Sequence, residues 1–274
     1  MFANTLPNNL IFSTVHLHLL FPDSTSTGFF YEILNEDRRH ILVVTNSHAL
    51  PIGIGEYNLQ IPLKNASENN EEPAGDNLIV DGVLHEKFVI RHPDPDVDLC
   101  CFELISLKTG SLPAGFSPFV RSFSRDLIPP EDKRFDAIEA LTMVGYPSGL
   151  YDSVNCIPIV RRGITATPLN YDFEGRKEFI VDMAVTPGSS GSPVVICDTN
   201  GYMEIDDSGE LKFNLGEQRL ILVGILKNAF IRNEEGSGDG NLKFSYQNWI
   251  NLGTAIKSCE LIKLEEAFLT AEHG

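Results

Sequence analysis

The sequence contains no long apolar run and few cysteines. No segment reaches about 18 uninterrupted apolar residues, so we expect neither a membrane span nor a membrane partner. The five cysteines are an odd number and do not form a disulfide framework. The N-terminus lacks the positive start of a signal peptide, and His16 and His18 interrupt its apolar stretch. Reduced cysteines and no export signal together predict a cytoplasmic protein.

Basic residues are scarce too. The chain has 21 Lys and Arg residues against 38 Asp and Glu residues, a formal net charge of -17. Such a surface repels phosphate, so we expect no nucleic-acid partner. No cysteine pair has metal-ligand spacing with histidine, and the acidic segment 234–240 does not match an EF-hand loop. We therefore expect no metal and no cofactor, and interpret 234–240 as a hairpin loop.

Strand signals dominate what is present. The 22 glycines and 16 prolines suit many turns between short apolar, aromatic or β-branched runs. We predict an all-β chain with one strand set in residues 1–120, a linker over 121–134 and a second set in 135–274. Apolar residues at helical spacing predict a C-terminal helix over 252–271 that packs on the second set.

The strongest chemical signal is a glycine-rich turn at residues 185–195, Val-Thr-Pro-Gly-Ser-Ser-Gly-Ser-Pro-Val-Val, which leads into an apolar strand. Ser190 on this turn is a candidate nucleophile. Gly188 can let backbone N–H groups point into open space, where they would hold an oxyanion. A plain turn gives the same pattern, so the motif needs a base and a carboxylate elsewhere in the chain.

Two further residues supply those groups. His48 follows the apolar run 41–45, where a buried strand ends, and it is the candidate base. Asp98 immediately precedes the apolar run 99–102 and is the candidate carboxylate, whereas Asp94 and Asp96 lie beside prolines in a loop. Taken alone, His48 also suits a structural histidine and Asp98 a strand-start aspartate.

Together these segments resemble the trypsin/chymotrypsin-like serine peptidase family, with its intracellular bacterial members closest. The motifs are Thr45-Asn-Ser-His48, Asp98-Leu-Cys-Cys-Phe102 and Gly188-Ser-Ser-Gly-Ser-Pro193, in the family's chain order, and the resemblance spans roughly residues 10–255.

The resemblance implies a specific fold and activity. The fold would be two six-stranded antiparallel β-barrels with a C-terminal helix and a site in the crevice between the barrels. The protein would be a serine endopeptidase that cleaves protein or peptide substrates through an acyl-enzyme. His48 would be the general base, Asp98 its orienter and Ser190 the nucleophile, and the backbone N–H groups of Gly188 and Ser190 would form the oxyanion hole.

The same resemblance locates a substrate pocket. Ala184 would form its floor, and Lys227, Asn228 and Ala229 one wall. An alanine floor argues against a preference for Arg or Lys and predicts a small, uncharged or mildly polar P1 residue, while Lys227 leaves an acidic P1 open. Ser189 stands where secreted members carry an aspartate that pairs with a newly cut N-terminus, so we expect no activation by N-terminal cleavage.

Two other readings stay open at this point. One is a catalytically silent or partner-activated binding module on the same fold, with a regulatory protein as partner. The other is an α/β-hydrolase, which requires a Gly-x-Ser-x-Gly elbow before a helix and a later catalytic histidine. Ser190 instead precedes a strand-like run, and His273 is the only histidine that follows it, so the α/β-hydrolase fits poorly.

Overall fold

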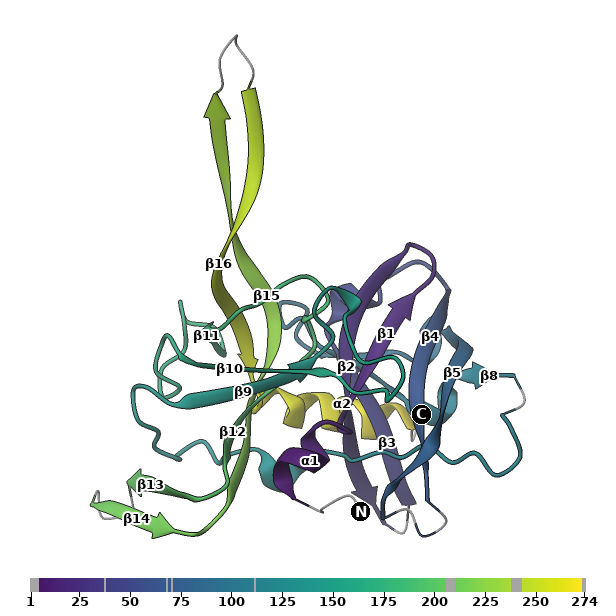
Figure 1. Ribbon diagram of the computed structural model, residues 1–274, viewed down its shortest axis with the longest axis horizontal. Helices are drawn as coiled ribbons and strands as arrows, with labels where there is room; N and C mark the ends of the chain where they lie inside the picture. The colour runs from purple at the N-terminus through teal and green to yellow at the C-terminus, as the bar shows by residue number, and fades with distance from the viewer. Residues whose placement is uncertain are drawn as a thin grey trace.

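The computed structural model contains two β-sheet assemblies, one from each half of the chain (Figure 1). The residues that the structure describes are 5–36, 38–67, 69, 71–110, 112–205, 210–237 and 243–272. Elements of the first half are α1 (Leu6–Leu10), β1 (Thr14–Leu19), β2 (Ser24–Asn35), β3 (Arg38–Thr45), β4 (Glu56–Ala66), β5 (Pro73–His85), β6 (Ile90–Arg91), β7 (Cys100–Glu103) and β8 (Lys108–Thr109).

The first assembly is an open sheet, and the prediction of a closed six-stranded barrel was wrong for this half. Its strand order is β6-β7-β3-β2-β1-β4-β5-β8, with eight strands. After β5 the chain passes through the 3-10 turn Glu86–Phe88 into β6, which has two residues and pairs with β7. The opposite edge, β8, also has two residues and pairs with β5. Neither edge strand reaches the other, so the sheet does not close.

The second assembly is a closed antiparallel barrel of six strands, and here the prediction is confirmed. The barrel runs β10-β11-β16-β15-β12-β9, and a separate two-stranded sheet is formed by β13 and β14. Elements of this half are β9 (Ala140–Gly145), β10 (Ile159–Thr165), β11 (Glu178–Asp182), β12 (Pro193–Asp198), β13 (Gly201–Ile205), β14 (Leu211–Leu215), β15 (Arg219–Ser237), β16 (Lys243–Lys257) and α2 (Glu260–Glu272).

Strand β12 carries the serine turn at its N-terminal end and is buried on both faces. Val194 and Ile196 point into the core of the closed barrel, whereas Val195 belongs to the apolar cluster between the two assemblies. A strand with apolar residues at consecutive positions is expected where both faces are covered. The serine turn therefore begins at the junction of the two halves.

The C-terminal helix begins later than predicted. Residues 252–257 complete strand β16, where Leu252 pairs with Asp182 and Ile256 with Glu178, and α2 starts at Glu260. So short a segment suits either structure by its sequence, and pairing with the neighbouring strands β11 and β15 decides in favour of the sheet.

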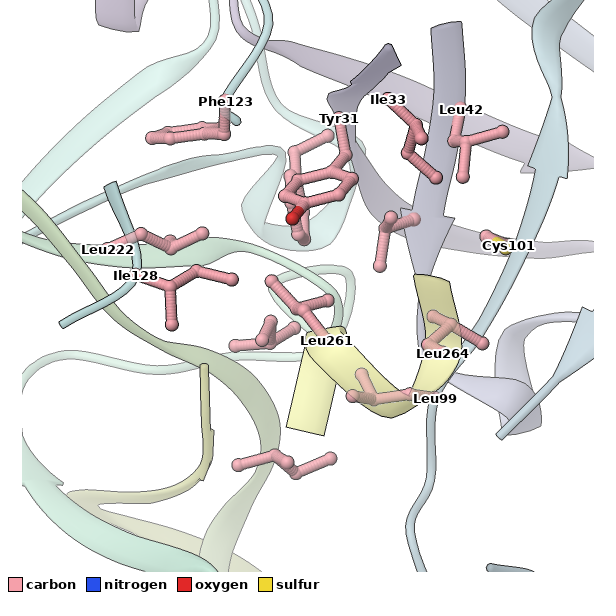
Figure 2. Packing of buried hydrophobic residues seen from close by; sticks show 14 of the residues in the cluster. Tyr31, Ile33, Leu42, Leu99, Cys101, Phe123, Ile128, Leu222, Leu261 and Leu264 are labelled. Atoms are coloured by element: carbon pink, nitrogen blue, oxygen red, sulfur yellow. The ribbon is translucent and has the colours of Figure 1, made fainter. Parts of the chain in front are cut away.

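The helix also packs differently from the prediction. Leu261, Leu264 and Phe268 lie in a cluster that contains residues of both assemblies. Figure 2 shows Leu261 and Leu264 among Tyr31 and Leu42 of the first half and Leu222 of the second. The helix contacts β6 and β7 of the first assembly. It therefore covers the seam between the halves rather than the second barrel alone.

Cysteines are packing residues in this fold. All five are free, with Cys100 and Cys101 buried on β7. Burial raises the pKa of the Cys100 thiol to about 12 and that of Cys101 well above its usual range. In the described part of the chain, no helix is long and apolar enough to span a membrane.

Candidate active site

Strand pairing brings the candidate base and carboxylate together. Strand β3 pairs with β7 so that Thr45 faces Cys100. The end of β3 therefore lies beside the start of β7. The 3-10 turn Ser47–Ala49 follows β3 and is held against residues 98 and 99 by two side chains. Asn46 Nδ2 donates to the Asp98 carbonyl at 2.8 Å, and Ser47 Oγ donates to the Leu99 carbonyl at 2.9 Å.

His48 and Asp98 make two hydrogen bonds to each other. The Nδ1 atom of His48 lies 2.6 Å from Asp98 Oδ2, and the backbone N–H of His48 donates to Oδ1 at 3.0 Å. In the neutral ring, the carboxylate accepts from Nδ1–H, and this tautomer has Nε2 as its unprotonated nitrogen. The histidine side chain is 53% exposed and the aspartate side chain 18%. The imidazole thus presents Nε2 at the surface, while Nδ1 is hydrogen-bonded to Asp98.

Only one serine of the turn retains solvent exposure. Ser189 and Ser192 are fully buried, and within the described structure their hydroxyl oxygens have no hydrogen-bond partner. Ser190 lies between them and is half-buried. Gly188 and Gly191 flank it with φ angles of 84° and 86°, in the left-handed region that favours glycine. This turn selects Ser190 as the serine that can meet a ligand.

Two backbone donors of the turn remain unused. Ser189, Gly191 and Ser192 donate their N–H groups to the carbonyls of Thr186, Leu226 and Ser189 at 3.1, 2.8 and 3.1 Å. The N–H groups of Gly188 and Ser190 donate to no residue that the structure describes. Two free donors in one tight turn, separated by a single residue, can hold one anionic oxygen.

The chief link between the serine turn and the first assembly is Thr27 of β2, which sequence analysis missed. Its N–H donates to the Ser190 carbonyl at 2.9 Å, and its hydroxyl donates to the Gly188 carbonyl at 2.8 Å. The same hydroxyl accepts from the Tyr146 N–H at 3.0 Å, and the Thr27 carbonyl accepts from Thr45 Oγ1 at 2.8 Å. These partners lie far from Thr27 in the sequence, so no local motif marks it.

In the described structure, the candidate nucleophile Ser190 and the candidate base His48 are not hydrogen-bonded to each other. Thr45 lies three residues before His48 and contacts Thr27, which holds Ser190, so the two candidates belong to one junction. Among the described residues, however, no hydrogen bond joins His48 Nε2 to Ser190 Oγ. Such bonds are often long or poorly aligned without substrate.

Gly191→Ala is expected to disturb the contacts of the serine turn with Thr27 and Thr45 and so to destabilise the protein. An alanine Cβ at position 191 would overlap the Thr27 carbonyl oxygen and lie 2.6 Å from Thr45 Oγ1. We expect the free energy of unfolding, measured by denaturant titration, to fall by about 2 kcal/mol or more. Gly175→Ala is the control, since Gly175 has φ +75° but a Cβ added there would meet nothing within 4 Å. Equal losses in both variants would contradict the tight junction.

The four predicted pocket residues do not line one hollow. Lys227, Asn228 and Ala229 line a hollow of about 290 Å³, and Ala184 lies outside it. The Lys227 ammonium pairs with Glu178 at 2.8 Å, so its charge is turned toward a buried carboxylate of β11. Ala184 is exposed, and its carbonyl accepts from the Arg161 guanidinium at 2.6 Å.

His16 packs against the loop of residues 146–151, which contacts the serine turn. Its ring stacks on Tyr146 with centroids 5.1 Å apart and lies near Tyr151. That loop contacts the turn, since the Ser148 N–H donates to the Pro187 carbonyl at 2.6 Å. Burial, aided by the nearby His18, lowers the pKa of His16 to about 4. The imidazole is therefore neutral in the folded protein at neutral pH.

Acidification is expected to destabilise the protein through His16. Its folded pKa is below the unfolded value, so the stabilisation is complete above pH 6.5 and is lost as pH falls toward 4. Between pH 7.5 and 4.5 the native chain should lose about 2 kcal/mol more than His16→Gln, which cannot titrate. Denaturant unfolding at both pH values measures this difference. Equal losses in the two proteins would contradict a buried neutral His16.

No group of three or more potential metal ligands occurs in the described residues.

Fold and site define a β-protein in which a His–Asp pair from one sheet lies at the same junction as a serine turn from a closed barrel. Residues 26–202, more than half of the chain, match the family described as trypsin-like peptidase domain. The chain belongs to this family.

Solved structures resemble the chain at low identity. Deg5 is 15% identical, with 93% of this chain and 88% of that chain covered and a TM-score of 0.48. A scabies mite inactivated protease paralogue is 12% identical, with 96% and 97% covered and a TM-score of 0.48. No curated protein matches the sequence.

Proposed function

We propose that the protein is a serine endopeptidase that cleaves peptide bonds through an acyl-enzyme. His48 acts as general base, Asp98 orients it and Ser190 is the nucleophile. The observation that carries the proposal is the doubly hydrogen-bonded His48–Asp98 pair, which aims a basic nitrogen outward at the junction where the half-buried Ser190 is the one serine of the turn that retains solvent exposure. Membership of the trypsin-like peptidase family supports the same chemistry.

The proposed reaction has two halves. Ser190 Oγ attacks the substrate carbonyl carbon while its proton passes to His48 Nε2, and the resulting oxyanion accepts from the N–H groups of Gly188 and Ser190. The C–N bond then breaks, and the imidazolium gives its proton to the departing amine. Water next attacks the acyl-enzyme ester, again giving its proton to His48. The proton returns to Ser190 Oγ as the ester bond breaks.

The side chains around the predicted pocket favour an uncharged P1 residue. Lys227 is already paired with Glu178, so its ammonium is not available to an acidic substrate side chain without loss of that ion pair. Ala184 has no charged side chain, and the Arg161 guanidinium beside it is hydrogen-bonded to the Ala184 carbonyl. We therefore propose cleavage after small, uncharged residues rather than after Arg, Lys, Asp or Glu.

Cleavage of a mixed peptide library by the native chain tests the proposed activity and specificity. Mass spectrometry of the products would locate each cut. We expect cuts inside the peptides, mainly after small uncharged residues. Cleavage strictly after Arg or Lys would overturn the pocket assignment, and exclusive removal of terminal residues would overturn the endopeptidase assignment.

A catalytically silent or partner-activated module is a second candidate. One observation favours it, since no hydrogen bond joins His48 to Ser190 in the structure as described. In this alternative a regulatory protein partner would close the site. A well-folded native chain that cleaves no peptide would favour this alternative.

We also infer a reducing, cytoplasmic location, which five free cysteines support. The partners that we propose are peptides or proteins, because the net charge of -17 disfavours nucleic acid.

A further inference from the structure

The two-stranded ribbon β13–β14 turns its polar face toward the body of the protein. On this face Glu204 pairs with Lys133 at 3.0 Å and accepts from Asn214 Nδ2 at 2.9 Å. The Arg219 guanidinium lies 4.6 Å from the Tyr202 ring centroid. Asn214 is buried. The ribbon, at the lower left of Figure 1, is therefore held in a fixed orientation by polar contacts.

The opposite face of the ribbon is apolar and faces solvent. Side chains alternate between the faces of a strand, so Leu211, Phe213 and Leu215 share the outer face, and Met203 pairs with Phe213 across the ribbon. Their exposed fractions are 65%, 62% and 77%, with 53% for Met203. Four large apolar side chains on one exposed ribbon mark an interaction surface, because a two-stranded ribbon alone is marginally stable in water.

The outer edge of β14, which faces away from β13, carries backbone N–H and C=O groups that do not pair with β13. The Gly216 N–H donates to the Asn200 carbonyl at 3.4 Å, and the Asn214 carbonyl oxygen lies close to Gly201, so even-numbered residues point toward β13. By alternation, the N–H and C=O groups of residues 211, 213 and 215 point outward. The sheet has two strands, so this edge has no partner strand among the described residues.

The pattern of apolar and polar residues in β14 is symmetric about its centre. It reads Leu-Lys-Phe-Asn-Leu from 211 to 215. An antiparallel strand of the same sequence, centred on Phe213, would face Phe213 with Phe213 and Leu211 with Leu215. Lys212 would face Asn214, and Glu210 would face Gly216. A chain of net charge -17 could thus meet its own copy here with no carboxylate opposite a carboxylate.

We propose that this edge pairs with the β14 edge of a second copy of the chain. The contact is isologous, as twofold symmetry requires, and it joins two ribbons into one four-stranded antiparallel sheet. The outward groups of residues 211, 213 and 215 form the new ladder. The apolar side chains pack against their cross-strand neighbours, which removes part of their surface from water. The proposal is independent of catalysis.

Sedimentation equilibrium on the full chain, from about 1 to about 200 µM, tests the proposal. We expect the native mass to rise toward twice the 30.4 kDa of one chain. Phe213→Lys places two cations at the symmetry axis and should weaken association at least about 10-fold. Phe230→Lys on β15 is the matched control, an exposed aromatic off this ribbon that should leave the mass unchanged. Circular dichroism would verify folding of each variant.

A pair of double variants tests the register. Leu211→Lys with Leu215→Glu sets each introduced lysine opposite an introduced glutamate, whereas Leu211→Lys with Leu215→Lys sets lysines opposite lysines. We expect the first to associate at least about 10-fold more tightly than the second. A monomeric native chain at all concentrations, or loss of the dimer in Phe230→Lys but not in Phe213→Lys, would overturn the proposal.

Discussion

Ser190→Ala is expected to lower kcat for peptide hydrolysis by about 10⁴- to 10⁶-fold, the range seen when the nucleophile of a serine peptidase is removed. The turn holds Ser190 by its backbone, since its carbonyl accepts from the Thr27 N–H at 2.9 Å. The alanine variant therefore keeps the backbone contacts of the turn and loses the hydroxyl alone. Steady-state kinetics on a peptide substrate identified by library cleavage would measure the effect.

Ser189→Ala is the matched control for this prediction. Ser189 is buried, and its hydroxyl oxygen lacks a partner among the described residues, so removal of that oxygen breaks no hydrogen bond. We expect its activity to stay within about threefold of the native value. Equal losses in Ser189→Ala and Ser190→Ala would mean that the turn is disturbed and would remove the case for Ser190 as nucleophile.

Asp98→Asn is expected to lower kcat by about 10⁴-fold, the effect that loss of the correct histidine tautomer has in a known Ser-His-Asp peptidase. Both oxygens of Asp98 accept hydrogen bonds from His48, from Nδ1 at 2.6 Å and from the backbone N–H at 3.0 Å. An asparagine has one acceptor oxygen, so one of these donors must face an NH₂ group. If the amide nitrogen faces Nδ1, the imidazole carries its proton on Nε2 and cannot accept one from Ser190.

Asp96→Asn provides the control for the charge change. Asp96 is exposed, lies two residues before Asp98 and makes no contact with His48 in the described structure. Its replacement removes the same unit of charge without a change in the histidine's partners, so kcat should stay close to the native value. A similar fall in both variants would point to long-range electrostatics instead of an oriented imidazole.

Much of the candidate site could be predicted from the sequence because its residues stand at strand ends. His48 and Asp98 each adjoin an apolar run, and those runs became β3 and β7. The contact between them depends on the pairing of Thr45 with Cys100, which a single sequence does not specify. Thr27 was missed because its four hydrogen bonds join segments 18 to 163 positions away.

The fold was predictable in class and less so in closure and element ends. Short strand signals predicted an all-β chain, but the lengths of β6 and β8, two residues each, keep the first sheet open. The predicted loop at 234–240 lies partly in strand β15, which continues to Ser237, and its residues 238–240 fall outside the described structure. Turn-forming composition predicted a loop there, whereas pairing with β16 extends the strand.

Covalent labelling with a fluorophosphonate tests the central claim most directly, because this reagent reacts with an activated serine and requires no knowledge of the substrate. Peptide mass spectrometry of the native chain should locate one adduct, on Ser190. His48→Ala should remove most of the labelling while the fold is retained. A well-folded native chain that takes up no label, or an adduct on another residue, would contradict a peptidase assembled around His48, Asp98 and Ser190.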